Sequence, residues 1–398
     1  MSEVVRDLPP TSPVAARARY LAPDLARGVM LLIVAAVHAH MYLSNSVRVV
    51  RGYPPEMGSV LDSISAAVLT VFCDGRSYPM FAALFGYGMA QIFARQQRAG
   101  HDWSATRKLL RRRSWWLLLC GFVHVLLLFA GDILGAYGFI GLLFVGMMRS
   151  SARKLFTVAG LFIAVGSLIY AGSLFLTATG EGGETGSALF MVADPALDAT
   201  YRVAGWPFTT PMFAIAMAGP FLIGVWAARM RLLEEPERRR RLLRRIAVVG
   251  IALTVAGGAP LALITSRVWT DAPPAALLPL TILHTLTGYA GGFGYAAAIG
   301  LLAIRFRDKR GPVVTAIAAC GQRSMTSYLL QSVAWVLLFA PYTLDLGSRL
   351  GVLGSLGIAV GTWLCTVVIA EALRRADARG PAEYLLRKAT YGAAAATR

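Results

Sequence analysis

Long apolar segments separated by short polar ones are the dominant pattern of this chain. A helix needs about 20 mostly apolar residues to cross a bilayer. By that criterion we predict ten membrane-spanning helices, at residues 25–43, 77–95, 114–131, 133–149, 154–176, 208–228, 246–266, 276–304, 312–340 and 351–373. The predicted fold class is therefore all-α, a polytopic integral membrane protein.

The composition also indicates that lipid is the solvent of this chain. Its 398 residues are 56% hydrophobic and only 15% charged, whereas soluble domains carry about 25% charged residues. The net charge of +18 comes from Lys and Arg that cluster in the connections between apolar segments. Most of these clusters fall on one side of the predicted bundle, so we expect this side, with both termini, to be cytoplasmic. No basic soluble domain is left that would bind nucleic acid.

This topology divides the chain into three parts. We predict a disordered cytoplasmic tail at residues 1–23, a transmembrane helical domain at 24–376 and a cytoplasmic C-terminal tail at 377–398. Residues 57–72 are also apolar, but a crossing there would place the strongly basic segment 95–113 outside the cell. We therefore predict that 57–72 is a helix that lies at, or dips into, the outer membrane interface and ends at a turn at Cys73–Arg76.

Familiar sequence motifs give little guidance to the chemistry. Residues 178–206 are the one sizeable outer connection, for which we favour a plain surface loop over a lid or an acceptor-binding flap. The four cysteines lie in or beside apolar segments without CxxC spacing, so we predict neither a metal site nor a disulfide. The sequence has no HExxH motif, no phosphate-binding loop and no Ser-His-Asp motif.

Three ionisable residues fall inside the predicted helices at a similar depth. Counting about 1.5 Å per residue from the last cytoplasmic arginine places His38 and His124 roughly 16 Å deep and Arg323 roughly 20 Å deep. Such a group costs about 2.5–3.5 kcal/mol at the centre of a bilayer. Each histidine could simply hydrogen-bond to a neighbouring helix, but a guanidinium at this depth favours a polar cavity lined by all three residues.

A histidine in such a cavity can act as a general base or nucleophile, because its ordinary pKa is about 6.5. His38 and His40 are about 200° apart around a helix, so they cannot both face one cavity. Asp132, at the outer end of the third predicted helix, either pairs with a cation or is a solvated helix end.

Five sequence blocks are similar to those of the YeiB-like family of multi-pass bacterial membrane proteins, whose function is uncharacterised. They are DLARG at 24–28, DGRSYPMFAALFGYG at 74–88, GFVHVLLLFAGDILGAYGFIGLL at 121–143, GQRSMTSYLLQS at 321–332 and GPAEYLLRKATY at 380–391. The third block, which carries His124 and Asp132, is the most specific. The resemblance covers nearly the whole chain and implies the bacterial plasma membrane as its location.

The YeiB-like family resembles a distant branch of the transmembrane acyltransferases. Those enzymes move an acyl group from cytosolic acyl-CoA to an acceptor across the membrane, supported by an Arg at the start of the first helix and a His further along it. Arg27 and His38 are similar to this pair. The resemblance implies acyl-CoA as a co-substrate and no metal cofactor.

The function that these features favour is acyl transfer from cytosolic acyl-CoA to an envelope or lipid-linked acceptor. His124 or His38 would take a proton from the acceptor, and Asp132 would orient the acceptor. Arg323 would stabilise the developing oxyanion. The phosphates of the donor would be held by Arg27, Arg107, Arg111, Arg112 and Arg113.

Two other classes of function stay open on sequence alone. A transporter or exporter of a small or lipid-like molecule needs the same polar layer, in a site that opens to alternate sides. An accessory membrane subunit would instead have a polar layer in which every group is paired. The expected partners are membrane lipid and a small-molecule, glycan or lipid acceptor, while a homo-oligomer is left open.

Overall fold

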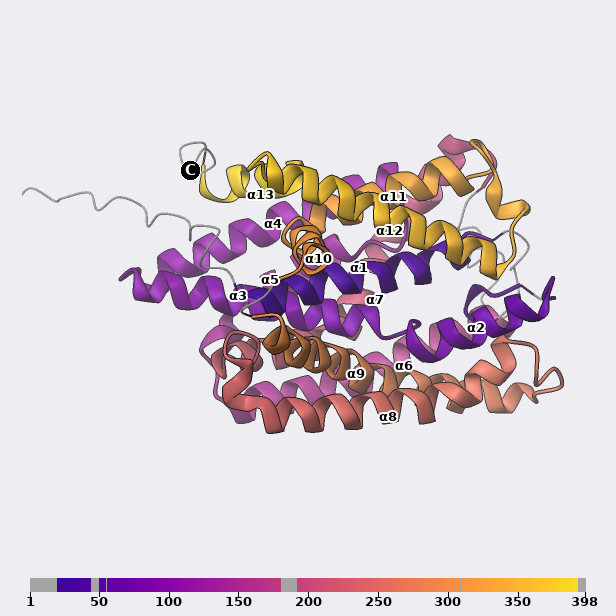
Figure 1. Ribbon diagram of the computed structural model, residues 1–398, viewed down its shortest axis with the longest axis horizontal. Helices are drawn as coiled ribbons and strands as arrows, with labels where there is room; N and C mark the ends of the chain where they lie inside the picture. Colours follow the sequence, from indigo (N-terminus) through magenta and orange to yellow (C-terminus); the bar gives the residue numbers. More distant parts are fainter. Residues whose placement is uncertain (1–19, 44–49, 55, 180–191, 308–309, 393–398) are drawn as a thin grey trace, which may run out of the picture.

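The computed structural model describes residues 20–43, 50–54, 56–179, 192–307 and 310–392. These residues form helices and no strand, and most of the helices run side by side along the long axis of the molecule (Figure 1). In this described part, six helices are long and apolar enough to cross a membrane: α1 (Leu21–Met41), α6 (Ala152–Thr179), α7 (Pro195–Arg229), α8 (Arg240–Thr265), α9 (Pro274–Arg305) and α12 (Val352–Arg375). The predicted all-α class and the prediction of a membrane protein are confirmed at this level.

Shorter or more polar helices complete the bundle. They are α2 (Val60–Phe72), α3 (Ser77–Arg98), α4 (Trp103–Leu127), α5 (Ile133–Phe144), α10 (Pro312–Gln322), α11 (Ser324–Phe339) and α13 (Pro381–Tyr391), with 3₁₀ turns η2 (Val50–Gly52), η3 (Val145–Arg149), η5 (Pro236–Arg239) and η6 (Leu346–Ser348). The predicted C-terminal tail thus contains a helix, α13, whereas residues 1–19 of the predicted N-terminal tail lie outside the described residues.

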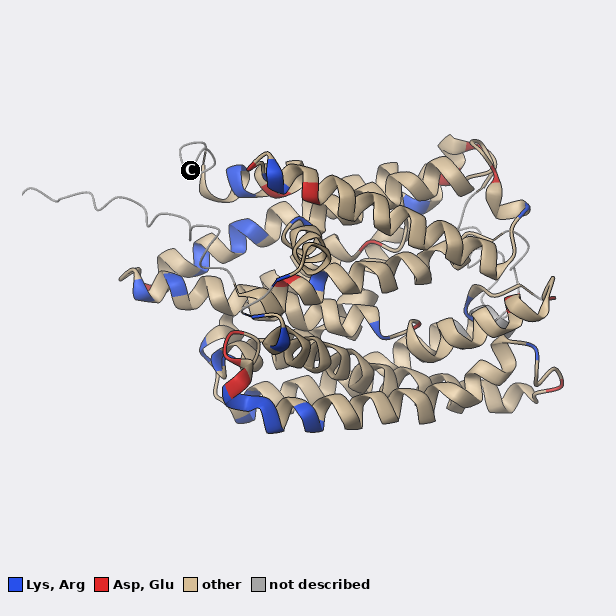
Figure 2. Cartoon of the chain, in the orientation of Figure 1, with Lys and Arg blue, Asp and Glu red and all other residues tan. Residues whose placement is uncertain are grey.

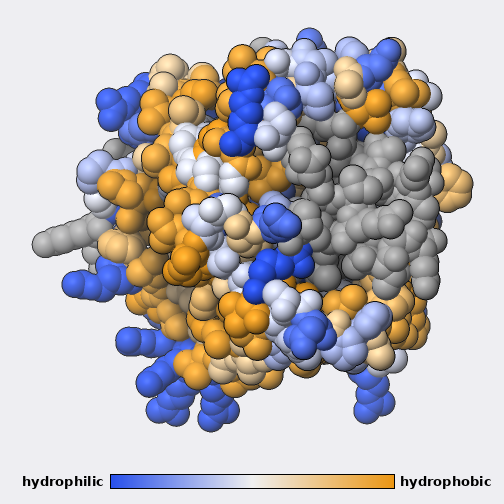
Figure 3. Space-filling model, turned by 90° about the vertical axis from the view of Figure 1, so that its right-hand side faces the viewer, coloured by the Kyte–Doolittle hydropathy of each residue, from blue (hydrophilic) through white to orange (hydrophobic). Residues whose placement is uncertain are grey.

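Basic residues gather at one end of the bundle. In Figure 2 the Lys and Arg at the α3–α4 connection, the start of α8 and α13 lie toward the left, at the end where α1 begins. The opposite end, seen face-on in Figure 3, mixes polar and apolar residues in its described part. The two ends differ in charge in the way that the positive-inside rule leads one to expect.

The apolar stretch 57–72 forms α2, and its course agrees with the second of the two predicted placements, a helix that dips inward and ends at the turn Cys73–Arg76. It runs along α8, and α3 continues from it after a turn at Cys73–Arg76 (Figure 1). Its polar side is the buried one: Thr70 hydrogen-bonds to Thr265 of α8 at 2.7 Å, while Val60, Leu61, Ile64 and Val68 are exposed. An interfacial helix would show the reverse, with its apolar side buried and its polar side exposed.

The predicted span 312–340 is two helices that meet at Arg323. In Figure 1, α10 runs across the bundle while α11 runs along it. The backbones of α10 and α1 touch where Gly321 lies against the carbonyl of Asp24 and the amide of Gly28. A Cβ at this position would overlap backbone atoms of α1, so the crossing requires glycine.

Part of the predicted outer loop 178–206 is helix as well. α7 begins at Pro195, because the Asp194 side chain accepts the N–H groups of Ala196 and Leu197 and proline fits the first helical position. Residues 180–191 lie outside the described part. α7 is therefore longer than the apolar segment from which it was predicted.

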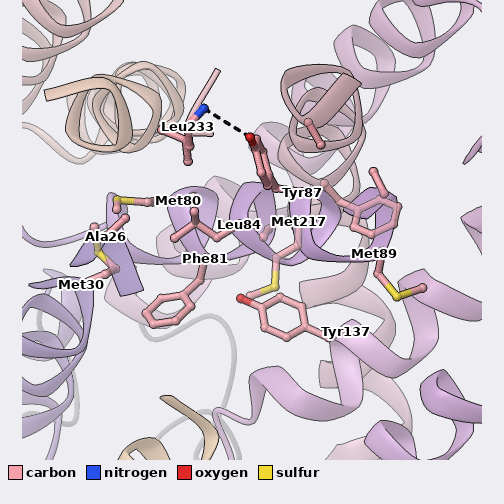
Figure 4. Packing of buried hydrophobic residues seen from close by; sticks show 14 of the residues in the cluster. Ala26, Met30, Met80, Phe81, Leu84, Tyr87, Met89, Tyr137, Met217 and Leu233 are labelled. Carbon is pink, nitrogen blue, oxygen red and sulfur yellow. Dashed lines mark hydrogen bonds between the residues drawn. The ribbon is translucent and has the colours of Figure 1, made fainter. Parts of the chain in front are cut away.

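Close packing of large apolar side chains holds the centre of the bundle together. Figure 4 shows Phe81 and Leu84 of α3 beside Tyr137 of α5 and Met217 of α7. A hydrogen bond of 3.2 Å from the Leu233 amide to the Tyr87 hydroxyl closes the basic end of this core. These contacts fix the positions of α3, α5 and α7 relative to one another.

Gly321→Ala tests the crossing of α10 over α1. We expect it to destabilise the protein by about 1–3 kcal/mol, because the new methyl group overlaps the Asp24 backbone. The matched control is Gly160→Ala in α6, where nothing lies within 4 Å; this change is expected to be neutral or to stabilise by up to about 1 kcal/mol. Thermal unfolding in detergent measures both, and equal unfolding temperatures would contradict the crossing.

Candidate active site

Asp132, His124 and Ser332 lie together in the interior of the bundle. His124 Nδ1 is 2.9 Å from Asp132 Oδ1, and His124 Nε2 is 2.8 Å from Ser332 Oγ. All three residues are at most 2% exposed. We call this arrangement the Asp–His–Ser relay. Sequence analysis proposed His124 and Asp132 but missed Ser332, because Ser332 lies on α11, far from the other two in the sequence.

Two helix ends hold the relay in position. Arg202 of α7 donates to the carbonyls of Val125 at 2.9 Å and Leu126 at 3.1 Å, which fixes the last turn of α4. Asp132 caps α5 by accepting the N–H of Gly135. An aspartate here also complements the positive end of the α5 dipole. Asp132 is therefore a buried cap and not a solvated helix end.

The partners of His124 define which nitrogen acts as the base. The Asp132 carboxylate favours a proton on Nδ1, although this N–H does not point straight at Oδ1. Nε2 then has a free lone pair that can accept the hydrogen of the Ser332 hydroxyl at 2.8 Å, in competition with the Tyr328 carbonyl at 3.3 Å. This is the orientation in which a histidine can remove a proton from a serine.

Two aromatic rings separate His38 from the relay. The ring of Phe129 lies 4.7 Å from that of His38 and 6.5 Å from that of His124, between centroids. Tyr328 lies 6.3 Å from His38 and 5.1 Å from His124. His38 is partly exposed, whereas His124 is buried. The two histidines predicted to share a layer are thus near neighbours, and the more open side of the site is that of His38.

Several buried polar atoms near the relay have no hydrogen-bond partner among the described residues. They are Gln331 Oε1, Trp335 Nε1, Tyr42 Oη and Tyr137 Oη. Gln331 and Trp335 adjoin Ser332 on α11. An unpaired buried group costs about 1–3 kcal/mol, and such groups commonly mark a place that water or a ligand occupies. Among the described residues, the polar layer therefore contains unpaired groups. An accessory subunit would instead have a layer in which every polar group is paired.

Arg323 does not join the relay. Its Nη1 donates to the carbonyl of Ala319 at 3.3 Å and its Nε to that of Ala378 at 3.2 Å, at the break between α10 and α11. The predicted depth assumed one straight helix, but α10 runs across the bundle and adds little depth (Figure 1). The prediction that Arg323 shares a polar layer with His38 and His124 is wrong.

The candidate phosphate-binding arginines divide into two groups. One group faces outward from α4 and lines a shallow, open depression of about 540 Å³ together with two tryptophans and Lys108. The arginines of this group are Arg107, Arg111 and Arg112, and the two tryptophans are Trp115 and Trp116. Trp beside Arg and Lys is typical of a membrane interface, so this face fits lipid headgroups better than a buried donor.

Arg27 and Arg113 face the interior instead. Arg27 donates to the carbonyl of Leu84 at 3.4 Å, and the Nε of Arg113 is buried with no hydrogen-bond partner in the described part of the chain. The two guanidinium groups lie within electrostatic range of each other. Tyr137 lies within such range of both Arg27 and Asp132. Arg113, Arg27, Tyr137 and Asp132 therefore form a series in which each group lies within electrostatic range of the next, and Arg27 also pairs with Asp24 at 3.4 Å. We call this series the polar track.

A second buried polar cluster surrounds Asp74, and sequence analysis missed it. The Asp74 carboxylate accepts from Tyr53 at 2.8 Å and from Arg51 Nε at 3.4 Å, and its Oδ1 is 3.9 Å from His40 Nε2. The ring of His40 also stacks on that of Tyr53, with centroids 4.3 Å apart. Burial and the nearby carboxylate raise the pKa of the Tyr53 phenol well above its ordinary value, so Tyr53 donates to Asp74.

Arg76 and His284 extend this cluster. Arg76 is fully buried, and its Nη1 lies 2.6 Å from His284 Nε2, while its Nη2 donates to the carbonyl of Thr254 at 3.2 Å. Arg76 Nη1 also donates to the carbonyl of Asp74. Asp74 and Arg76 occupy the turn between α2 and α3. This turn lies in the second sequence block shared with the YeiB-like family, at 74–88, and that block was the feature of the sequence that could have identified the cluster. We call the residues Arg51, Tyr53, Asp74, Arg76, His40 and His284 the Asp74 cluster.

The fold and the two buried clusters define a helical membrane protein with a polar interior. Residues 227–393 match the family described as "Protein of unknown function (DUF418)". The chain is 29% identical over 357 residues to "Uncharacterized protein YeiB" of Escherichia coli (strain K12), across 84% of this chain and 86% of that protein. It is 25% identical over 363 residues to "Uncharacterized protein YxaH" of Bacillus subtilis (strain 168), across 84% and 83%. These similarities confirm the predicted resemblance to the YeiB-like family.

Proposed function

We propose that this protein is an integral-membrane acyltransferase that moves an acyl group from cytosolic acyl-CoA to an envelope or lipid-linked acceptor. The observation that carries the proposal is the buried Asp–His–Ser relay, in which a histidine lone pair faces a serine hydroxyl. A buried histidine that served packing alone would also need a partner on each nitrogen. What supports catalysis is the order of the partners, with a carboxylate on one nitrogen and a nucleophilic hydroxyl facing the other.

The proposed reaction has two steps. In the first, Ser332 Oγ attacks the thioester carbonyl while His124 takes its proton; the C–S bond then breaks and His124 returns the proton to the CoA thiolate. In the second, an acceptor hydroxyl or amine attacks the acyl-serine while His124 takes its proton; the bond between the acyl carbon and Ser332 Oγ then breaks, and His124 returns the proton to Ser332 Oγ. Asp132 keeps the His124 ring oriented and stabilises its protonated form.

The polar track would bring the donor to the relay. Arg113 and Arg27 would hold the phosphates of acyl-CoA, since guanidinium groups bind phosphate through charge-assisted hydrogen bonds. The pantetheine arm would then run past Tyr137, whose hydroxyl has no partner among the described residues. The outward-facing arginines Arg107, Arg111 and Arg112 have no part in this pathway.

The acceptor would approach from the side of His38. This ring is partly exposed, while Phe129 and Tyr328 stand between it and His124. A modest movement of these two rings would connect the partly exposed side to Ser332. His38 would then hydrogen-bond the acceptor rather than take its proton.

The topology that goes with this function has ten crossings and both termini in the bacterial cytoplasm. The crossings would be α1, α2 with α3, α4, α5 with η3, α6, α7, α8, α9, α11 and α12. Residues exposed at opposite ends test it: Ser104→Cys at the basic end and Ser348→Cys at the other. A membrane-impermeant thiol reagent should label only the second in intact cells, and labelling of the first would overturn the orientation.

His124→Gln should lower the rate of acyl transfer by about 10²–10⁴-fold, because the glutamine side chain cannot act as the base. His38→Gln should lower it less. The matched control is His101→Gln, which lies exposed in the α3–α4 connection and should leave the rate unchanged. Release of CoA thiol in proteoliposomes measures all three, and equal rates for the wild type and His124→Gln would eliminate the relay mechanism.

Arg113→Gln and Arg27→Gln should each weaken binding of a non-hydrolysable acyl-CoA analogue by about tenfold, the loss of one charge-assisted contact. Arg112→Gln next to Arg113 is the matched control, because its side chain is exposed and points away from the track. Titration calorimetry in detergent provides the affinities. The proposed donor path is wrong if Arg112→Gln weakens binding as much as Arg113→Gln.

A further inference from the structure

We propose that the Asp74 cluster is a binding site for a phosphodiester anion. It lies on the other side of α1 from the Asp–His–Ser relay, since His40 faces this cluster and His38 faces the relay. The proposal does not depend on acyl transfer, and its test uses no enzymatic activity.

The charges of the cluster do not balance. Arg51 and Arg76 contribute two positive charges, while Asp74 contributes one negative charge. His284 accepts from Arg76 and is therefore neutral. Tyr53, Tyr78, Tyr170, Tyr295 and Cys73 also lie within electrostatic range of one or both guanidinium groups. In the described part of the chain, the one carboxylate that forms an ion pair with either of them is Asp74, 3.4 Å from Arg51 Nε.

A buried unpaired charge is costly in an apolar interior, and buried charges in proteins are normally paired. Among the described residues, this cluster is therefore one negative charge short. A monoanion would supply it, whereas a dianion would leave the cluster net negative.

Two nitrogens are free to receive the anion. Arg51 Nη1 and Arg76 Nε are buried and have no hydrogen-bond partner among the described residues. The side chain of Arg51 is only 6% exposed and that of Arg76 is fully buried, so water at the surface does not satisfy them. Each is an N–H donor of the planar guanidinium group, which is suited to phosphate oxygens.

Gly75 leaves room between the side chains of His284 and Arg51. Its φ of +74° lies in the left-handed region, and a Cβ there would stand 3.4 Å from His284 Nε2 and 3.9 Å from Arg51 Nη2. A side chain would therefore occupy the space between His284 and Arg51. The N-terminus of α3, which begins at Ser77, adds the positive end of a helix dipole to the same place.

The position of the cluster favours a phosphodiester over other monoanions. Arg51 belongs to the connection that follows α1, at the end of the bundle opposite the basic clusters. The donors come from more than one direction, from Arg51, Arg76 and the α3 amides, which suits a tetrahedral group with several oxygens. A phosphodiester has this shape and a single charge, and it occurs both in phospholipid headgroups and in free organic phosphates.

The test measures thermal unfolding of the full-length chain in dodecyl maltoside, a detergent without phosphate. Dimethyl phosphate, or added phosphatidylglycerol, should raise the unfolding temperature by about 3–6 °C relative to sodium chloride at equal ionic strength. A rise with both identifies a site open to free phosphodiesters, and a rise with the lipid alone identifies a headgroup site. No rise with either would overturn the proposal.

Two variants should shift this response in opposite directions. Arg51→Gln balances the remaining charges of Asp74 and Arg76, so the phosphodiester should no longer stabilise the protein. Asp74→Asn leaves two cations without a carboxylate, so its stabilisation should exceed that of the wild type. The matched control Arg349→Gln, an exposed arginine at the same end, should respond as the wild type does.

A purely structural role predicts a different pattern. Both Arg51→Gln and Asp74→Asn would then lower the unfolding temperature, and the phosphodiester would have the same effect on each. Such a result would contradict the site. If a variant does not fold, native mass spectrometry of the wild-type chain decides: a retained phospholipid, exchanged by dimethyl phosphate, supports the site, and a chain with no phospholipid and no stabilisation overturns it.

Discussion

The structure depends on one constraint: an ionisable side chain buried among apolar helices must find a partner inside the protein. α1 carries an ionisable residue toward each of two sides. The buried His40 lies beside Asp74 and Arg51, whereas the partly exposed His38 packs on Phe129 and Tyr328 beside the relay. Because the two histidines are two positions apart on one helix, α1 divides the polar interior into two separate clusters.

Helix ends inside the bundle make these clusters available. The α4–α5 turn carries Asp132, the α2–α3 turn carries Asp74 and Arg76, and the α10–α11 break carries Arg323. Helix ends leave backbone N–H and C=O groups unpaired, and charged side chains satisfy them: Asp132 accepts the N–H of Gly135, and Arg323 donates to Ala319 and Ala378. Irregular backbone within a membrane protein is tolerated where protein surrounds it, and at such places polar chemistry can be built.

The hydrophobic pattern predicted most of the architecture, because length and apolarity are enough to recognise helices such as α1, α6, α8, α9 and α12. It did not predict where a helix breaks or which side of a helix is buried. The depth of Arg323 was counted along a straight helix that in fact breaks at this residue, and 57–72 was assigned to the interface although α2 buries its polar side.

The candidate site was predictable only in part, and for a physical reason. His124 and Asp132 stand out as ionisable groups in or beside apolar segments. Burying such a group in a membrane costs free energy, which marks both residues as candidates for a functional site. Ser332 carries no charge, and hydroxyl groups are common in such helices; only its 2.8 Å contact with His124 across 208 positions reveals it. Arg76 was visible in the sequence, but its role depends on Asp74, Arg51 and His284, which three-dimensional packing alone brings together.

The most direct measurement of the central claim is an experimental structure of the full-length protein in a lipid nanodisc with a non-hydrolysable acyl-CoA analogue. Our account predicts phosphates at Arg113 and Arg27, the pantetheine arm beside Tyr137, and the carbonyl carbon of the acyl group within attacking distance of Ser332 Oγ. A donor bound elsewhere, such as on the outward face of α4, with the relay closed and unapproached, would contradict it.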